Sequence, residues 1–189
     1  TFENHLKKIE DFLWGEQFPV YAQWKKDWYA AYQRDGGCRF HTGFIMTGPH
    51  KKNDITNYCI QGDSSNCMVW SLIRINRILR KYKMRSRAIC EIHDCIVFDC
   101  YPPERDDLVH ICRQVMVGDV TKAWPWIIAP LEVESECCPV DRSWHDKVAL
   151  TEKDGVFVPA DISKWEKRYG SWSLQVAAGT GSATPLCGA

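Results

Sequence analysis

The segment DITNYCIQGDSSNCMVWSLIRINRILRKYK, residues 54–83, constrains the fold more than any other part of the chain. Apolar residues recur in it at alternating steps of four and three, namely Met68, Leu72, Ile75, Leu79 and Tyr82. Residues spaced in this way lie on one face of an α-helix. We therefore predict a long helix with one buried stripe.

The opposite face of this predicted helix is basic. Its members, which continue past the helix, are Arg74, Arg77, Arg80, Lys81, Lys83, Arg85 and Arg87. Such a face is either solvated or lies along a phosphate backbone, and the pattern is compatible with both interpretations. The whole chain has 24 Lys and Arg against 24 Asp and Glu, so any nucleic-acid contact depends on a local patch of this kind.

A second constraint follows this helix, in AICEIHDCIVFDC at residues 88–100. Two short apolar runs flank His93 and Asp94, which predicts two strands with these residues at the turn between them. An aspartate beside apolar surface needs either a hydrogen-bond partner or a functional role. The side chains could simply bond the turn backbone. Alternatively, a carboxylate held at a turn is well placed to bind a divalent metal ion.

The remaining elements point to an α+β fold, because helices alternate with antiparallel strands and no βαβ pattern repeats. We expect helices at residues 3–15, 19–35, 103–124 and 161–172, a ragged hairpin at 38–51 and an edge strand at 130–136. In the second helix, Trp24, Trp28 and Tyr32 recur at four-residue steps. This stripe favours packing, with stacking on nucleic-acid bases as the alternative.

Cysteine usage and hydropathy indicate the cellular compartment in which the chain resides. The ten cysteines are scattered and several occupy apolar positions, which indicates reduced cytosolic thiols rather than a disulfide scaffold. No CxxC pair is present, which argues against a structural zinc site. The sequence has no signal peptide and no long apolar run, so we predict no membrane segment and a cytoplasmic location.

Two amides stand upstream, in TNYCIQGDSSN. Asn57 and Gln61 are four residues apart and thus share a helical face, and Gly62 would allow close approach of another backbone. Amides both donate and accept hydrogen bonds, so such a pair can contact a minor groove without demanding one base sequence. Cross-linking the protein interior is the other role open to them.

Taken in order, these features resemble the C-terminal third of family A DNA polymerases. The resemblance covers about residues 12–146 and is most specific in NYCIQGDSSN and ICEIHDCIVFD. It implies that Asp94 is the metal-binding aspartate of the palm and that His93 lies near the primer terminus. It also implies that Asn57 and Gln61 contact the primer–template, while Arg74 and Arg77 help to hold the duplex.

The resemblance also implies a division of the chain into three parts. Residues 1–50 would form helices on the fingers side with their connecting loop, and residues 51–146 a palm segment with the His93–Asp94 hairpin. Residues 147–189 would be a partly irregular C-terminal extension.

Departures from the family pattern concern the second metal carboxylate. Cys95 replaces the usual glutamate after His93–Asp94, Asn53 replaces an arginine, and the motif with the first palm aspartate is missing. None of the acids in the chain is a compelling substitute, whether Glu91, Asp99, Glu132, Glu134 or Glu136.

The family resemblance therefore implies a phage-type split polymerase, completed by a second chain with the remaining palm, fingers and thumb. Two Mg²⁺ ions would be shared between the chains. Primer–template DNA and dNTP would be the other partners, in the cytoplasm of a phage-infected host or a bacterium.

Two alternatives remain open. One is a non-catalytic nucleic-acid-binding subunit with a palm-like fold, which Cys95 and the missing carboxylates favour. The other is a fragment of a single-subunit RNA polymerase, although the N-x-x-x-Q-G helix leans towards DNA.

Overall fold

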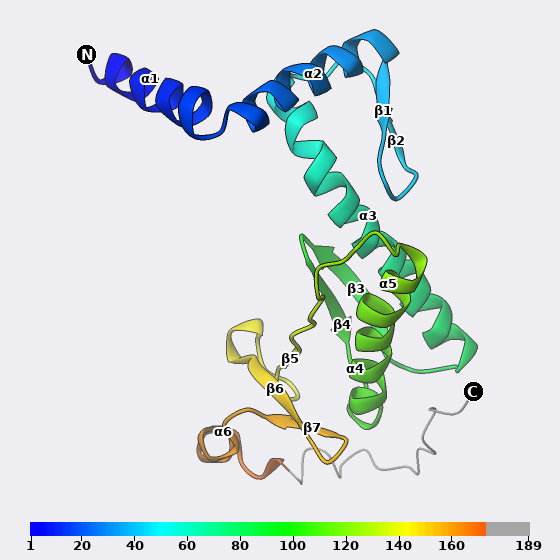
Figure 1. Cartoon of the computed structure of the whole chain (residues 1–189). Coiled ribbons are helices and arrows are strands. Elements are labelled where there is room, and N and C mark those ends of the chain that lie inside the picture. Colours follow the sequence, from blue (N-terminus) through cyan, green and yellow to red (C-terminus); the bar gives the residue numbers. More distant parts are fainter. Residues whose placement is uncertain (173–189) are drawn as a thin grey trace. The chain divides into compact units, whose positions relative to one another are not determined.

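The computed structural model describes residues 1–172, and the chain divides into two compact units, residues 1–66 and 67–189. Helices combine with small antiparallel sheets, which confirms the predicted α+β class (Figure 1). The end of the predicted C-terminal extension, residues 173–189, lies outside the described residues. No helix within residues 1–172 is long and apolar enough to cross a membrane.

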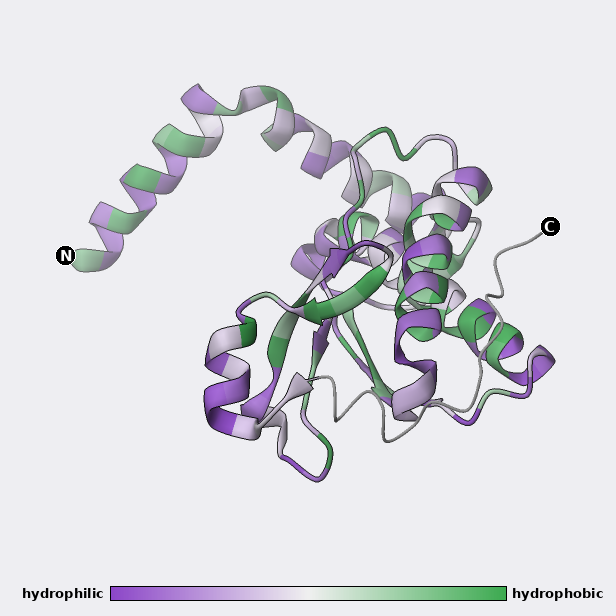
Figure 2. Ribbon diagram, turned by 90° about the horizontal axis from the view of Figure 1, so that it is seen from below, coloured by the Kyte–Doolittle hydropathy of each residue, from purple (hydrophilic) through white to green (hydrophobic). Residues whose placement is uncertain are grey.

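The first unit begins with α1 (Phe2–Phe12), a π-helical turn (Leu13–Gln17) and α2 (Pro19–Asp35). The Thr1 hydroxyl accepts a hydrogen bond from the Asn4 N–H at 3.4 Å and caps α1. Pro19 opens α2, and Gly36, with φ 70°, ends it. No residue of α1 is buried, although apolar and polar residues alternate along it (Figure 2).

The core of the first unit lies between α2, a short hairpin and the start of α3. The hairpin pairs β1 (Gly37–Arg39) with β2 (Ile45–Thr47), and α3 spans Lys52–Lys81. Its buried residues are Tyr32, Phe40, Met46 and Ile55. The Tyr32 hydroxyl donates to the Gly48 carbonyl at 2.8 Å, and the Trp28 indole donates to the Ile55 carbonyl at 3.1 Å. At these two positions the aromatic stripe packs within the protein, as favoured from the sequence.

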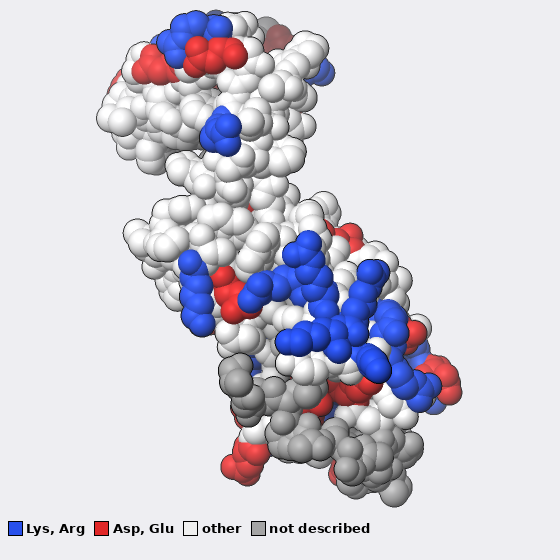
Figure 3. Space-filling model, turned by 90° about the vertical axis from the view of Figure 1, so that its right-hand side faces the viewer, with Lys and Arg blue, Asp and Glu red and all other residues white. Residues whose placement is uncertain are grey.

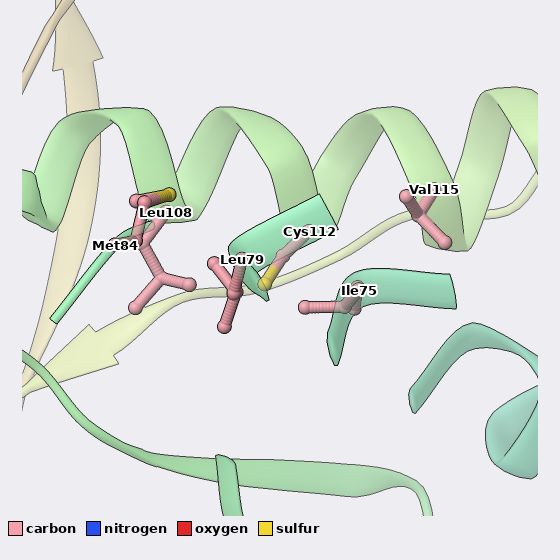
Figure 4. Close-up of a cluster of buried hydrophobic side chains, with 6 residues drawn as sticks. All are labelled: Ile75, Leu79, Met84, Leu108, Cys112 and Val115. Atoms are coloured by element: carbon pink, nitrogen blue, oxygen red, sulfur yellow. The ribbon is translucent and has the colours of Figure 1, made fainter. Parts of the chain in front are cut away.

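The second unit packs α3 and α4 against a hairpin. Its elements after α3 are β3 (Arg87–Ile92), β4 (Cys95–Asp99), a 3₁₀ turn (Pro102–Glu104), α4 (Arg105–Arg113), a π-helical segment (Gln114–Asp119) and α5 (Val120–Ala123). The core consists of Ile75, Leu79, Met84, Leu108, Cys112 and Val115 (Figure 4). Ile96 and Phe98 of β4 pack against this cluster, so one face of the hairpin rests on the helices.

The predicted stripe of the long helix is wrong at its last member. Ile75 and Leu79 are buried, but the side chain of Tyr82 is 45% exposed. The reason is that α3 ends at Lys81 and that Lys83 takes a left-handed conformation with φ 54°. The chain therefore reverses there, and Met84 instead of Tyr82 fills the end of the core.

A three-stranded sheet and a helix complete the second unit. They are β5 (Glu136–Cys137), β6 (Val148–Lys153), β7 (Val156–Pro159) and α6 (Ile162–Tyr169), with strand order β5-β6-β7. The edge strand predicted at 130–136 is shorter than expected, because its ladder begins only at Glu136. The β6–β7 hairpin was missed, although its Asp154-Gly155 turn is a common hairpin signal.

Candidate active site

His93 and Asp94 form the two-residue turn between β3 and β4, as predicted. Ile92 pairs with Cys95 across the ladder, so the turn is as short as an antiparallel hairpin allows. His93 has φ 57°, a left-handed conformation in which histidine is enriched among non-glycine residues. Both side chains are exposed. Asp94 makes no hydrogen bond or ion pair with any of residues 1–172, so bonding to the turn backbone does not account for it.

The base of the hairpin is held by a buried serine and a glutamate. The Glu104 carboxylate accepts hydrogen bonds from the backbone N–H groups of Arg85 and Ser86, both at 2.8 Å, and from the Ser86 hydroxyl at 2.7 Å. The Ser86 oxygen in turn accepts from the Tyr101 N–H at 3.0 Å. Both ends of the hairpin are thereby tied to the 3₁₀ turn that starts α4, which orients the tip.

These hydrogen bonds favour the ionised form of Glu104. Burial of the carboxyl opposes ionisation, but the bonds from Arg85 and Ser86 outweigh it, and the pKa of Glu104 is lowered. A lowered folded-state pKa adds stability that is present above the unfolded value of about 4.3 and is lost as the pH falls through the folded pKa.

We expect Glu104→Gln to lower the free energy of unfolding at neutral pH by about 1–2 kcal/mol, because the charge-assisted bonds are lost. The deficit should shrink in acid, where the wild-type carboxyl is also protonated. Thermal unfolding across the acidic range measures this, with Glu132→Gln, at an exposed acid, as the control. A deficit that is constant with pH would contradict the role of the charge.

Two of the acids considered as a second metal ligand have other positions or partners. Asp99 lies opposite Arg87, at the far end of the hairpin, and Glu136 pairs with Lys147 at 2.6 Å. Within residues 1–172, no group of three or more His, Cys, Asp or Glu side chains could hold a metal ion. Asp94 offers one carboxylate, the kind of ligand that Mg²⁺ prefers.

Asn57 and Gln61 lie on α3 in the first unit, whereas His93 and Asp94 belong to the second unit. Both amide side chains are exposed and make no hydrogen bond with residues 1–172, so cross-linking of the interior does not account for them. The expectation for Gly62 is corrected, since what approaches it is an aromatic ring. A Cβ at Gly62 would lie 2.8 Å from the Cζ atom of Phe40.

Sequence reasoning missed the residue that anchors the other side of this helix. Asp63 is 7% exposed and accepts from the Thr42 N–H at 2.9 Å, with the His41 Nδ1 atom at 3.0 Å. It follows Gly62 directly and lies seven residues, two helical turns, after the buried Thr56. A buried acid requires partners, so this spacing could have indicated a structural role.

The basic face is formed as predicted, but several of its side chains contact other residues of the protein. Lys and Arg side chains gather on one side of the second unit (Figure 3). Arg74 pairs with Asp119, and the Arg85 guanidinium lies 3.9 Å from the Tyr101 ring centre. Arg77, in contrast, is exposed and makes no hydrogen bond or ion pair with the described residues.

Comparison with known proteins gives one clear relative. No protein-family model matches the sequence. The chain is 41% identical over 104 residues to a DNA polymerase of Bacillus phage SP01, and this match covers 52% of the chain but only 11% of the length of the phage protein. A contiguous match over more than half of the chain must include its centre, so His93 and Asp94 lie within it.

A solved structure is also similar to the chain. The POL domain of Pol1 from M. smegmatis, in complex with DNA primer-template and dNTP, superposes with a TM-score of 0.49 and 17% identity, over 62% of this chain and 22% of that chain. The predicted resemblance to DNA polymerases is confirmed by the phage relative.

Proposed function

We propose that the chain is the C-terminal part of a family A DNA polymerase, completed by a second chain, and that Asp94 serves nucleotidyl transfer to a primer 3′ end. The observation that carries this proposal is the position of Asp94. It is exposed at a two-residue turn, has no partner within residues 1–172, and lies in the segment that matches a phage DNA polymerase. The left-handed backbone of His93 adds support, because such conformations cluster at functional sites.

Asp94 would hold Mg²⁺ through its carboxylate, while the neighbouring Cys95 thiol is a poor ligand for a hard cation. Bound Mg²⁺ lowers the pKa of an attacking hydroxyl and neutralises charge that develops on the phosphate. The role of the protein is to keep the carboxylate in place, which the paired strands and the Glu104 bonds do. The second carboxylate comes from the partner chain.

The other site residues bind the nucleic acid in this proposal. His93, next to the metal-binding aspartate, positions the primer end. Asn57 and Gln61 contact the minor groove, a role that their exposure and unpaired amides support. Arg74 and Arg77 belong to the basic face that follows the phosphate backbone, with Arg74 oriented by Asp119.

Arg77→Gln is expected to weaken binding to primer–template DNA and to reduce the slope of log K against log salt by about one, since one phosphate contact is lost. Fluorescence anisotropy at several salt concentrations measures both effects. Lys167→Gln, on α6 and outside the basic face, is the matched control. An unchanged salt slope in Arg77→Gln would mean that this face is solvated and does not contact the DNA phosphates.

The partner chain is proposed to cover α1. Isolated helices shorter than about 12–15 residues are marginal in water, so α1 needs tertiary contacts. Its apolar side chains nevertheless stay exposed within residues 1–172, with Phe2 75%, Ile9 50% and Phe12 50% exposed. A stripe of this kind fits the apolar surface of another polymerase segment.

A second candidate is a non-catalytic DNA-binding subunit. The observation that favours it is Cys95, which removes one carboxylate beside Asp94. The two candidates differ in whether the chain is needed for chemistry or only for binding.

Primer extension separates the two candidates. The chain is mixed with the Bacillus phage SP01 DNA polymerase from which the matching segment has been deleted. We expect extension of a labelled primer only when both proteins and Mg²⁺ are present. Primer–template binding by the chain without any extension in the mixture would support the non-catalytic subunit instead.

A further inference from the structure

The described part of the C-terminal extension, with β6, β7 and α6, is anchored on α4. Phe157 of β7 is fully buried, and its ring centre lies 4.9 Å from that of His110 and 4.6 Å from the Arg113 guanidinium. Arg113 also pairs with Glu152 of β6 at 2.9 Å. β7 accordingly lies beside α4 (Figure 1). The extension therefore packs on the helix that follows β4.

Arg105, the first residue of α4, links the extension to the start of this helix. Its side chain is only 11% exposed, and it donates a hydrogen bond to the Phe157 carbonyl at 2.8 Å. The guanidinium also lies 4.3 Å from the centre of the Trp172 ring and pairs with Asp106 at 2.7 Å. A largely buried charge requires such partners, and arginine can stack on a ring while it donates hydrogen bonds. Residues of the extension thus hold Arg105 in one position.

Arg105 directly follows the residue that holds the base of the catalytic hairpin. Glu104 ends the 3₁₀ turn before α4 and accepts from the N–H groups of Arg85 and Ser86. Burial raises the pKa of the Cys100 thiol to about 11, while the Ser86 side chain and the Arg105 cation, both nearby, oppose this shift. The anchor of the extension and the base of the hairpin are therefore neighbours in space as well as in sequence.

The position of Asp94 depends on what supports the hairpin. β3 and β4 pair only with each other among residues 1–172, and a two-stranded ribbon is marginally stable by itself. Its orientation is therefore set by the contacts beneath it and at its base. Groups that orient a metal ligand without touching the metal ion typically change metal affinity 10- to 100-fold when they are removed.

We propose that Arg105 is a positioning residue for Asp94, and that residues 148–172 serve the polymerase reaction by holding Arg105 in place. The extension fixes Arg105, Arg105 fixes the 3₁₀ turn, and Glu104 in that turn fixes the base of the hairpin. Arg105 contacts neither the metal ion nor the DNA in this arrangement. The inference rests on the proposed function, because nucleotidyl transfer is what requires Asp94 at a defined position.

Hydrogen–deuterium exchange of the chain alone tests the support of the hairpin. Arg105→Ala should speed exchange of the Arg85 and Ser86 amides at least about tenfold, since the turn that accepts their hydrogen bonds is loosened. Amides in the middle of α3 are the internal control. Arg113→Ala is the matched variant, because it removes a contact with the same Phe157 ring about two helical turns farther along α4. Unchanged exchange at Arg85 and Ser86 in Arg105→Ala overturns the inference.

Two more variants keep the test decisive if Arg105→Ala does not fold, which circular dichroism would report. Trp172→Ala removes the ring beside the guanidinium and should speed exchange at the same two amides about threefold. Arg105→Lys keeps the positive charge and a donor for the Phe157 carbonyl, so its exchange rates should lie between those of the wild type and the alanine variant. Wild-type exchange in Trp172→Ala would contradict the role of the extension.

The Mg²⁺ dependence of primer extension tests the link to the reaction. The chain is mixed with the Bacillus phage SP01 DNA polymerase lacking the matching segment. Arg105→Ala should raise the Mg²⁺ concentration that gives the half-maximal single-turnover rate about tenfold. A merely structural role would reduce the fraction of active protein and leave that concentration unchanged. This second outcome overturns the positioning role.

The outcomes also separate this inference from the proposed function. Extension by the wild-type mixture, with unchanged exchange and an unchanged Mg²⁺ requirement in Arg105→Ala, keeps the polymerase and overturns the role of Arg105. Faster exchange in Arg105→Ala, without any extension by the wild-type mixture, keeps the support of the hairpin and overturns its part in the reaction.

Discussion

Asp94→Asn is expected to reduce primer extension by the reconstituted polymerase about 10³-fold, because one charged ligand of the metal ion is lost. Asparagine has nearly the same size as aspartate and can still accept hydrogen bonds, so the turn should keep its shape. The expected decrease in primer extension therefore comes from the loss of a charge next to the reacting phosphate. Single-turnover extension of a labelled primer at saturating dNTP measures it.

Asp99→Asn is the matched control for this prediction. Asp99 is an exposed aspartate of the same hairpin, located at the end opposite the turn. We expect nearly full extension from this variant, and unchanged primer–template binding from both. Extension by Asp94→Asn at the wild-type rate would show that Asp94 is not a ligand of the metal ion. Weakened binding in Asp94→Asn would assign it to DNA contact instead.

Leu79→Ala is expected to lower the free energy of unfolding by about 2–5 kcal/mol, which is the usual cost of emptying a buried leucine site. Leu79 is 1% exposed and lies in the cluster that carries β4, with Ile75 and Leu108 (Figure 4). A cavity there also loosens the support of the hairpin. Urea unfolding, with the denaturant slope compared between variants, measures the change.

Tyr82→Ala is the control, because helical periodicity alone places Tyr82 in the same stripe as Leu79. The exposed side chain of Tyr82 predicts a change within about 0.5 kcal/mol. Similar losses in the two variants would mean that the helix continues past Lys81 and buries both residues.

The elements that the sequence predicted well are those whose signal is local. The long helix followed from apolar steps of three and four, and the start of α2 from Pro19. The turn at His93–Asp94 followed from two apolar runs of strand length. In each case a few neighbouring residues carry the information. The β6–β7 hairpin was missed although its Asp154-Gly155 signal is equally local.

The residues that hold the site in place were harder to identify from the sequence. Glu104 is eighteen residues from Ser86 along the chain, and Asp119 is 45 residues from Arg74. In the sequence, Glu104 is not distinguishable from other acids near a helix start. Arg74 is likewise not distinguishable from the other members of the basic face. Only their partners, brought close by folding, distinguish them from solvated charges.

The chain's own residues thus determined the helices, the turn that presents Asp94 and the likeness to a polymerase, because these depend on residue order over short distances. Three features depended on the folded chain: the end of the buried stripe at Met84, the Glu104 bonds beneath the hairpin, and the contacts of Arg105 with Phe157 and Trp172. Each is set by contacts between segments that are distant in sequence. No local pattern specifies which of several suitable side chains will meet.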